Sequence, residues 1–160
     1  SQASSLLEDV LAFMKGTVSA EESLYMLSMC YFQMKDYVTA SHYFTTYFNT
    51  YPRGGYAETA RFMSAKALYL DTPDPRLDQS STIKAIGEIQ LFTEYYPYSK
   101  HKDEVNHMLY DLHDRLVEKE YRSAKLYYDL GNYMGNNYQA CIITAETAAA
   151  RNSLKIFIAV

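Results

Sequence analysis

The chain has 160 residues, of which 48% are hydrophobic and 21% are charged, a balance typical of a folded globular protein. Its formal net charge is −4 and no basic cluster is present, so nucleic acid is not an expected partner. No stretch of the sequence approaches the roughly 20 apolar residues that a membrane-spanning helix needs.

The first segment, residues 1–18, is predicted to be part of a helical repeat. Ala3, Leu7 and Val10 have a small–large–large spacing that recurs twice later in the chain. Gly16 is placed to end this helix in a left-handed conformation. We therefore expect the chain to begin inside the second helix of an earlier repeat, which implies further sequence upstream.

Residues 19–55 are predicted to form two helices packed against each other. Ser19 is the expected N-cap of the first helix, with Glu22 three residues later as in a capping box. Lys35 and Asp36 interrupt the apolar pattern, so a turn is expected there, and Pro52 ends the second helix. The apolar face of the first helix is predicted to comprise Leu24, Leu27, Ser28 and Tyr31, and that of the second Ala40, Phe44 and Tyr47.

This spacing is that of the 34-residue tetratricopeptide (TPR) repeat, with Leu24 in place of its tryptophan and Ser28 in place of its glycine. Ala40 lets two helix backbones approach closely, while large residues fill the space beside it. One repeat cannot bury its apolar faces alone, so neighbouring repeats are expected. The predicted fold is an all-α, TPR-type solenoid that forms a single domain over residues 1–160.

Residues 56–100 are predicted to form a second repeat, which is interrupted by an inserted loop at residues 71–81. Ser80 or Ser81 is the expected N-cap of the helix that follows this loop. The first helix carries Ala60, Met63, Ser64 and Ala67, and the second repeats the earlier spacing with Ala85, Ile89, Phe92 and Pro97.

Residues 101–160 are predicted to contain a long helix and a further partial repeat. The long helix is expected to end near Leu130, because Gly131 and Gly135 follow among several asparagines. A last helix with TPR-like spacing is predicted from Tyr138, Cys141, Ala145 and Ala148. The apolar stripe of the long helix comprises Val105, Met108, Leu109, Leu112, Leu116 and Val117.

No pattern in the sequence indicates an enzyme, a metal site or a cofactor site. His101, His107 and His113 recur every six residues, which does not place them on one helix face. Cys30 and Cys141 are far apart in a solenoid, so a disulfide between them is not expected. There is no glycine-rich phosphate loop, no nucleophile elbow and no CxxC pair.

Three stretches carry a resemblance to a known family. They are YFTTYFNTYPRGGYAETARFMSAKALY, the insertion YLDTPDPRLDQSSTIKAIGEIQLFTEYYPYSK, and the helix MLYDLHDRLVEKEYRSAKLYYDLGNY. Together they resemble the BamD family of TPR lipoproteins, which belong to the β-barrel assembly machinery of Gram-negative outer membranes. The resemblance covers nearly all of the chain.

The resemblance implies a non-catalytic periplasmic scaffold, held at the inner leaflet of the outer membrane only by a lipid on the missing N-terminus. It implies two partners, the periplasmic domains of a BamA-like barrel assembly protein and segments of unfolded outer-membrane proteins. The lipidated cysteine of the family is absent from this sequence, and the C-terminal repeats that contact BamA are expected to be missing or cut off at Val160.

The concave surface of a TPR array is lined by first-helix residues that point away from the second helix. The spacing predicts that Glu22, Tyr25, Met29 and Phe32 line this surface in one repeat, and Glu58, Arg61, Ala65 and Tyr69 in the next. Aromatic, methionine and arginine side chains suit a peptide that carries aromatic residues and a carboxylate. With the turn that the resemblance adds, the predicted peptide-binding residues are Phe13, Gly16, Tyr25, Met29, Phe32, Arg61 and Tyr69.

Two other functions remain open from the sequence. The chain could be a different periplasmic or cytosolic TPR adaptor for another peptide, or a regulatory segment of a larger enzyme. A lipidated cysteine upstream would favour the assembly scaffold, and catalytic sequence downstream would favour the enzyme.

Overall fold

The computed structural model describes residues 18–74 and 77–134, together with 142–143, 145–147 and 149–150. The described part of the chain consists of helices joined by turns and loops and contains no strand, which confirms the predicted all-α fold. Five helices follow in chain order: α2 (Val18–Gln33), α3 (Tyr37–Thr50), α4 (Ala57–Leu70), α5 (Ser80–Tyr95) and α6 (Lys102–Met134).

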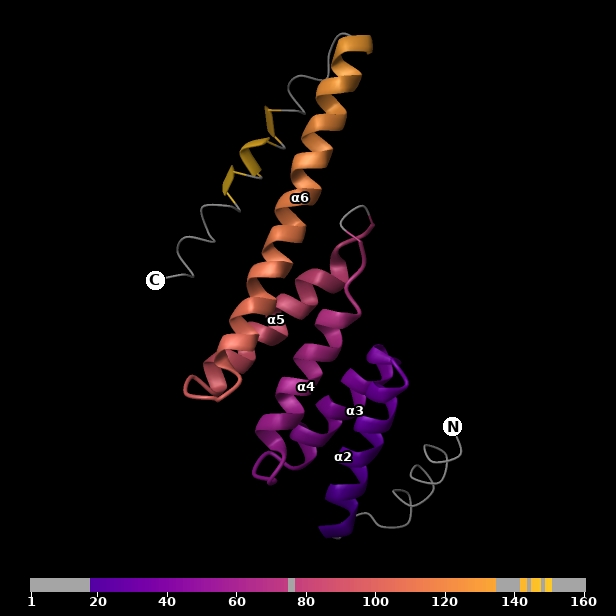
Figure 1. Ribbon diagram of the computed structural model, residues 1–160, viewed down its shortest axis with the longest axis vertical. Helices are drawn as coiled ribbons and strands as arrows, with labels where there is room; N and C mark the ends of the chain where they lie inside the picture. Colours follow the sequence, from indigo (N-terminus) through magenta and orange to yellow (C-terminus); the bar gives the residue numbers. More distant parts are fainter. Residues whose placement is uncertain (1–17, 75–76, 135–141, 144, 148, 151–160) are drawn as a thin grey trace.

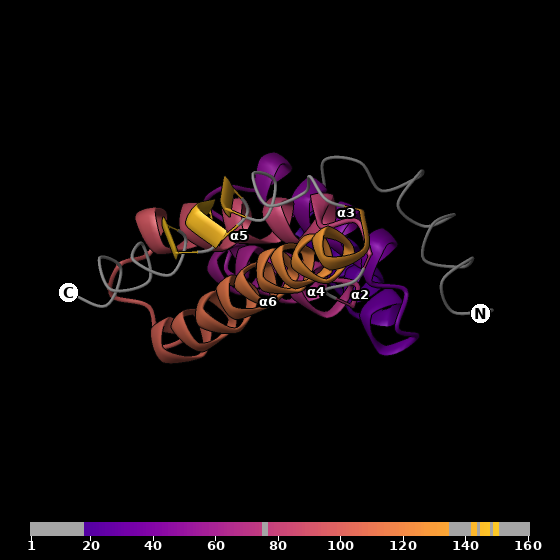
Figure 2. The ribbon, with the colours of Figure 1, turned by 90° about the horizontal axis from the view of Figure 1, so that it is seen from above.

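The helices lie in two layers, as a TPR-type solenoid requires. Each helix packs on the next, and α4 also packs on α6 (Figure 1). Viewed along the long axis, α2, α4 and α6 lie side by side in one layer, and α3 and α5 form the other (Figure 2). We call these the inner layer and the outer layer.

The turn between α2 and α3 lies where Lys35 and Asp36 were predicted to place it. The amide of Asp36 donates to the Tyr31 carbonyl and that of Lys35 donates to the Phe32 carbonyl, which is the Schellman pattern of a helix C-terminus. Lys35 has a φ of 62°, a left-handed conformation that is costly for a residue with a Cβ. Asp36 then caps α3, because its carboxylate accepts from the amide of Thr39.

The small residues at helix crossings are buried as the repeat spacing predicts. Ala40 and Ala85 both have 0% of their surface exposed. Ala40 belongs to a core cluster with Leu24, Phe44 and Tyr47, and Ala85 to a second cluster formed by α4, α5 and α6.

The inserted loop is held by its own polar groups and by α6. The Gln79 side chain donates to the carbonyls of Asp74 and Leu77, and accepts from Thr82. Lys119 of α6 also donates to the Leu77 carbonyl. The N-cap of α5 is Gln79, so the prediction of a serine cap was wrong. Buried Gln79 instead connects the loop to the first turn of the helix.

The carboxyl group of Asp78 accepts hydrogen bonds from residues at the start of α5. Bonds from Ser80 lower the pKa of this exposed carboxyl group. The carboxylate form is therefore the one that the first turn of the helix stabilises.

Helix α6 is longer than predicted and extends beyond α4 and α5 (Figure 1). Its lower half packs on the core through the predicted stripe, in which Val105, Met108 and Leu112 are buried. Gly131 lies inside the helix, so the prediction of a turn there was wrong. A single glycine makes helix formation less favourable by only about 1 kcal/mol, which is too little to end a helix of 33 residues.

Two other predicted features can be compared with the structure. Ser19 lies inside α2, which begins at Val18, so it is not the N-cap of that helix. In the predicted last helix, Tyr138, Cys141 and Ala148 lie outside the described residues, whereas Ala145 is helical.

Candidate peptide-binding site

Tyr25 of α2 forms the centre of an aromatic cluster. Its ring stacks on Tyr56, with centroids 4.6 Å apart, and meets the rings of Phe44 and Tyr47 edge-on at 6.0 and 5.9 Å. Burial raises the pKa of Tyr25, with a further contribution from Tyr56. The ring is half-buried, so one part of it packs on the core and the rest faces solvent.

A buried tyrosine beneath this cluster joins the two repeats. The Tyr47 hydroxyl donates to Glu21 at 2.5 Å and accepts from the amide of Tyr56 at 3.3 Å. Burial raises the pKa of Tyr47, and the bond to Glu21 raises it further. Gly54 passes so close that an added Cβ would lie 2.8 Å from this hydroxyl and would clash with Glu21. The position of Tyr25 therefore depends on a tightly packed junction.

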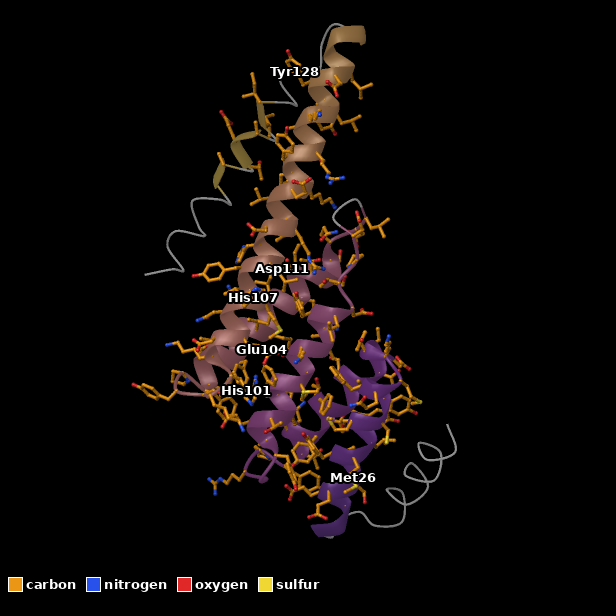
Figure 3. The ribbon with its side chains drawn as sticks, viewed as in Figure 1. Met26, His101, Glu104, His107, Asp111 and Tyr128 are labelled. Atoms are coloured by element: carbon orange, nitrogen blue, oxygen red, sulfur yellow. The ribbon has the colours of Figure 1, made fainter. Side chains whose placement is uncertain are left out.

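Met29 and Phe32 continue the same side of α2, four and seven residues after Tyr25. Both pack against the core cluster of the first repeat and are only partly buried. Phe32 meets the ring of Tyr37, the first residue of α3, edge-on at 5.5 Å. Met26, on a neighbouring face in the middle of α2, is 57% exposed (Figure 3).

Arg61 lies in a different environment from the α2 residues. Its guanidinium group lies between the rings of Phe48 and Tyr95, with its central carbon 4.7 and 4.0 Å from their centroids. Phe48 belongs to α3 and Tyr95 to α5, the two helices of the outer layer. The Nε atom is buried and has no hydrogen-bond partner among the described residues.

Tyr69 takes part in a polar network between α4 and α6. Its hydroxyl donates to Asp111 at 2.9 Å, and Arg115 forms an ion pair with the same carboxylate at 2.7 Å. Arg115 also lies over the Tyr69 ring and donates to Thr72. Burial raises the pKa of Tyr69, and the bond to Asp111 adds to this effect.

A second ion pair joins α4 to α6 near the start of α6, and a ring stack joins α4 to the residue that precedes α6. Lys66 pairs with Glu104 at 2.7 Å, and the His101 ring stacks on Phe62 with centroids 4.0 Å apart. His101, Glu104, His107 and Asp111 follow one another along this part of the chain (Figure 3). The described residues contain no group of three or more His, Cys, Asp and Glu side chains that could hold a metal ion.

The structure thus brings together only part of the predicted site. Tyr25, Met29 and Phe32 share one side of α2, whereas Arg61 lies between outer-layer helices and Tyr69 contacts α6. Phe13 and Gly16 lie outside the described residues. Ala65 is buried, so it does not line an open surface as the spacing predicted.

Sequence reasoning missed the two rings that hold Arg61. Tyr95 is 63% exposed and follows Lys84, Glu88 and Leu91 at helical spacing, a pattern that could have marked a second surface on α5. Phe48 directly follows buried Tyr47 and therefore points elsewhere on α3. Neither residue belongs to the repeat positions from which the site was predicted.

Comparison with models of protein families gives a match over nearly the whole chain. The family model described as YfiO, outer membrane lipoprotein, matches residues 1–158. No curated protein matches the sequence. Within the described part of the chain, no helix is both long and apolar enough to cross a membrane.

Proposed function

Because the chain belongs to the YfiO family of outer membrane lipoproteins, we propose that it is a non-catalytic scaffold of outer-membrane β-barrel assembly. In this role it binds segments of unfolded outer-membrane proteins and the periplasmic domains of a BamA-like assembly protein. Membership of this family implies association with the outer membrane. The proposed location is the periplasmic side of that membrane, with attachment through an N-terminal lipid.

The observation that carries the proposal is the half-buried surface of α2. Tyr25, Met29 and Phe32 rest on the core by one side and leave the other side accessible. The rings of Tyr25 and Phe32 are held in place before a peptide binds, so these side chains lose little conformational entropy on binding. Methionines beside them adapt to different apolar side chains, which suits a receptor for many substrate sequences.

Phe13 and Gly16 immediately precede α2, and we include them in the proposed peptide site. Arg61 and Tyr69 were predicted for the same site, but the guanidinium group of Arg61 lies between α3 and α5, and Tyr69 bonds to Asp111 of α6. Peptide binding is therefore expected to depend more on Tyr25 and Phe32 than on these two residues.

Titration of a labelled peptide tests the proposed site. The peptide is the C-terminal β-strand of an outer-membrane protein, and its affinity is expected to be micromolar because a flexible peptide loses entropy when it orders. Replacing Tyr25 by Ala should weaken binding by about 1–2 kcal/mol, as interface anchors commonly do. The control is Tyr98→Ala, which removes a tyrosine that is 99% exposed on the loop before α6.

Three outcomes of the titration are informative. Loss of affinity for Tyr25→Ala alone, with an unchanged circular dichroism spectrum, supports the site. Equal affinities for all three proteins would contradict it. Equal binding of a scrambled peptide would favour the alternative function, a TPR adaptor that recognises a different kind of segment.

The BamA-like partner is proposed from the family resemblance, and one feature of the structure supports it. Beyond Ala124 the apolar stripe of α6 continues, but its residues are exposed, and Leu126 has 56% of its surface accessible. Tyr128 lies on this same projecting part of the helix (Figure 3). A pull-down with the partner's periplasmic domains, comparing wild type with Leu126→Asp, tests whether this part of α6 contributes to the contact.

A further inference from the structure

A second candidate surface lies in the outer layer, between helices α3 and α5. Helices α3 and α5 both pack on α4, but they make no extensive contact with each other. Between them, over α4, lies a hollow of about 520 Å³, which is lined by Val38 and His42 of α3, Leu68 of α4, and Lys84 and Glu88 of α5. We call the space between α3 and α5, from this hollow to the rings of Phe48 and Tyr95, the groove.

The α5 wall of this groove has a regular pattern. Lys84, Glu88, Leu91 and Tyr95 are spaced at i, i+4, i+7 and i+11, so they share one face of the helix. Eleven residues of helix span about 16 Å. Leu91 and Tyr95 are 39% and 63% exposed, and Val38 on the opposite wall is also exposed. The groove is therefore an elongated, partly apolar surface that no described helix covers.

Arg61 of α4 lies at the opposite end of the groove from Lys84. The rings of Phe48 and Tyr95 hold its guanidinium group from both sides, and no carboxylate of the described residues forms an ion pair with it. A guanidinium that is already oriented by two rings binds a carboxylate strongly, since two parallel N–H groups can donate to it. At the other end, Glu88 lies one turn from Lys84 on the same face of α5, so the acidic group of a ligand is expected to pair with Arg61 rather than with Lys84.

We propose that the groove between α3 and α5 binds an amphipathic helix of a partner protein. The apolar face of that helix covers Leu91 and Val38, and a carboxylate on the same helix pairs with Arg61. A helix fits because two flanking helices with a third beneath them form the kind of groove in which amphipathic helices dock. This surface is separate from the peptide site on α2, and neither proposal depends on the other.

A pair of synthetic probes tests the proposal on the whole chain. The first is a labelled 15-residue helical peptide with leucines at i, i+4 and i+7 and a glutamate one turn beyond them, and the second replaces the glutamate with glutamine. Fluorescence anisotropy measures both affinities. We expect Arg61→Gln to weaken binding of the glutamate peptide by roughly tenfold and to leave the glutamine peptide nearly unchanged.

A matched pair of exposed residues on α5 provides variants that keep the fold. Leu91→Ala removes an apolar group from the groove face and should weaken both peptides several-fold. Ile83→Ala removes an apolar group that is 58% exposed but lies about 100° away around the helix, so it should have no effect.

The proposal is overturned if Leu91→Ala, like its control Ile83→Ala, binds both probes with the affinity of the wild type. It is also overturned if Arg61→Gln weakens the two peptides equally, since the carboxylate then plays no part. If Tyr25→Ala weakens binding of the probes as much as Leu91→Ala does, the probes bind on α2 instead, and the proposal is likewise contradicted.

Discussion

Removing one hydroxyl group should loosen the junction between the two repeats. In Tyr47→Phe the ring remains and keeps its contacts with Tyr25 and Tyr51, but the bonds to Glu21 and to the amide of Tyr56 are lost. A hydrogen bond to a charged group contributes about 1.5–3 kcal/mol, and a neutral bond contributes about 1 kcal/mol. Glu21 is partly accessible and can regain water. We therefore expect a loss of about 2 kcal/mol in the free energy of unfolding.

Urea denaturation at neutral pH measures this change. The dependence of unfolding free energy on urea should stay the same, because the buried surface hardly changes. Tyr98→Phe is the control, since its hydroxyl lies on a fully exposed side chain. A loss below about 0.5 kcal/mol for Tyr47→Phe would show that the hydroxyl does not hold the repeats together.

The same variant has a distinct signature at high pH. The pKa of Tyr47 is raised in the folded protein, so above about pH 10 the unfolded chain releases a proton that the folded chain retains. The stability of the wild type must then fall as pH rises, by up to about 1.4 kcal/mol per pH unit for this group. Phenylalanine has no such proton, so the difference between the two proteins should shrink from pH 9 to pH 11. A constant difference would contradict the assigned shift.

Three further changes test the packing and the turns by thermal or urea denaturation. Ala40→Leu should cost about 1–3 kcal/mol, because no space remains at the helix crossing; an unchanged melt would contradict the TPR register. Lys35→Gly should stabilise the fold by about 0.5–1 kcal/mol by relieving the left-handed backbone, whereas Gln33→Gly, in the last turn of α2, should not stabilise it. Gly54→Ala should destabilise by about 1–2 kcal/mol, because the new Cβ would displace Glu21 and the Tyr47 hydroxyl; wild-type stability would show that the junction can relax.

The sequence by itself determined the repeat architecture of this protein. The apolar residues of each helix recur at helical spacing, so Leu24, Leu27 and Phe44 could be assigned to buried faces without knowledge of their neighbours. Ala40 and Ala85 marked the helix crossings because only small side chains permit such close approach. The turn at Lys35 and Asp36 could also be predicted, since a local break in the apolar pattern and a capping residue define it.

Only the tertiary structure decided where the candidate site residues point. Arg61 and Tyr69 occupy equivalent faces of one helix in the repeat pattern, yet Arg61 meets Tyr95, 34 residues later, and Tyr69 bonds to Asp111, 42 residues later. Neither partner follows from spacing within a helix, because the angle at which neighbouring helices pack determines which side chains meet. The continuation of α6 through Gly131 is similar: local signals indicated a turn, but the energetic cost of one glycine is small within a helix of 33 residues.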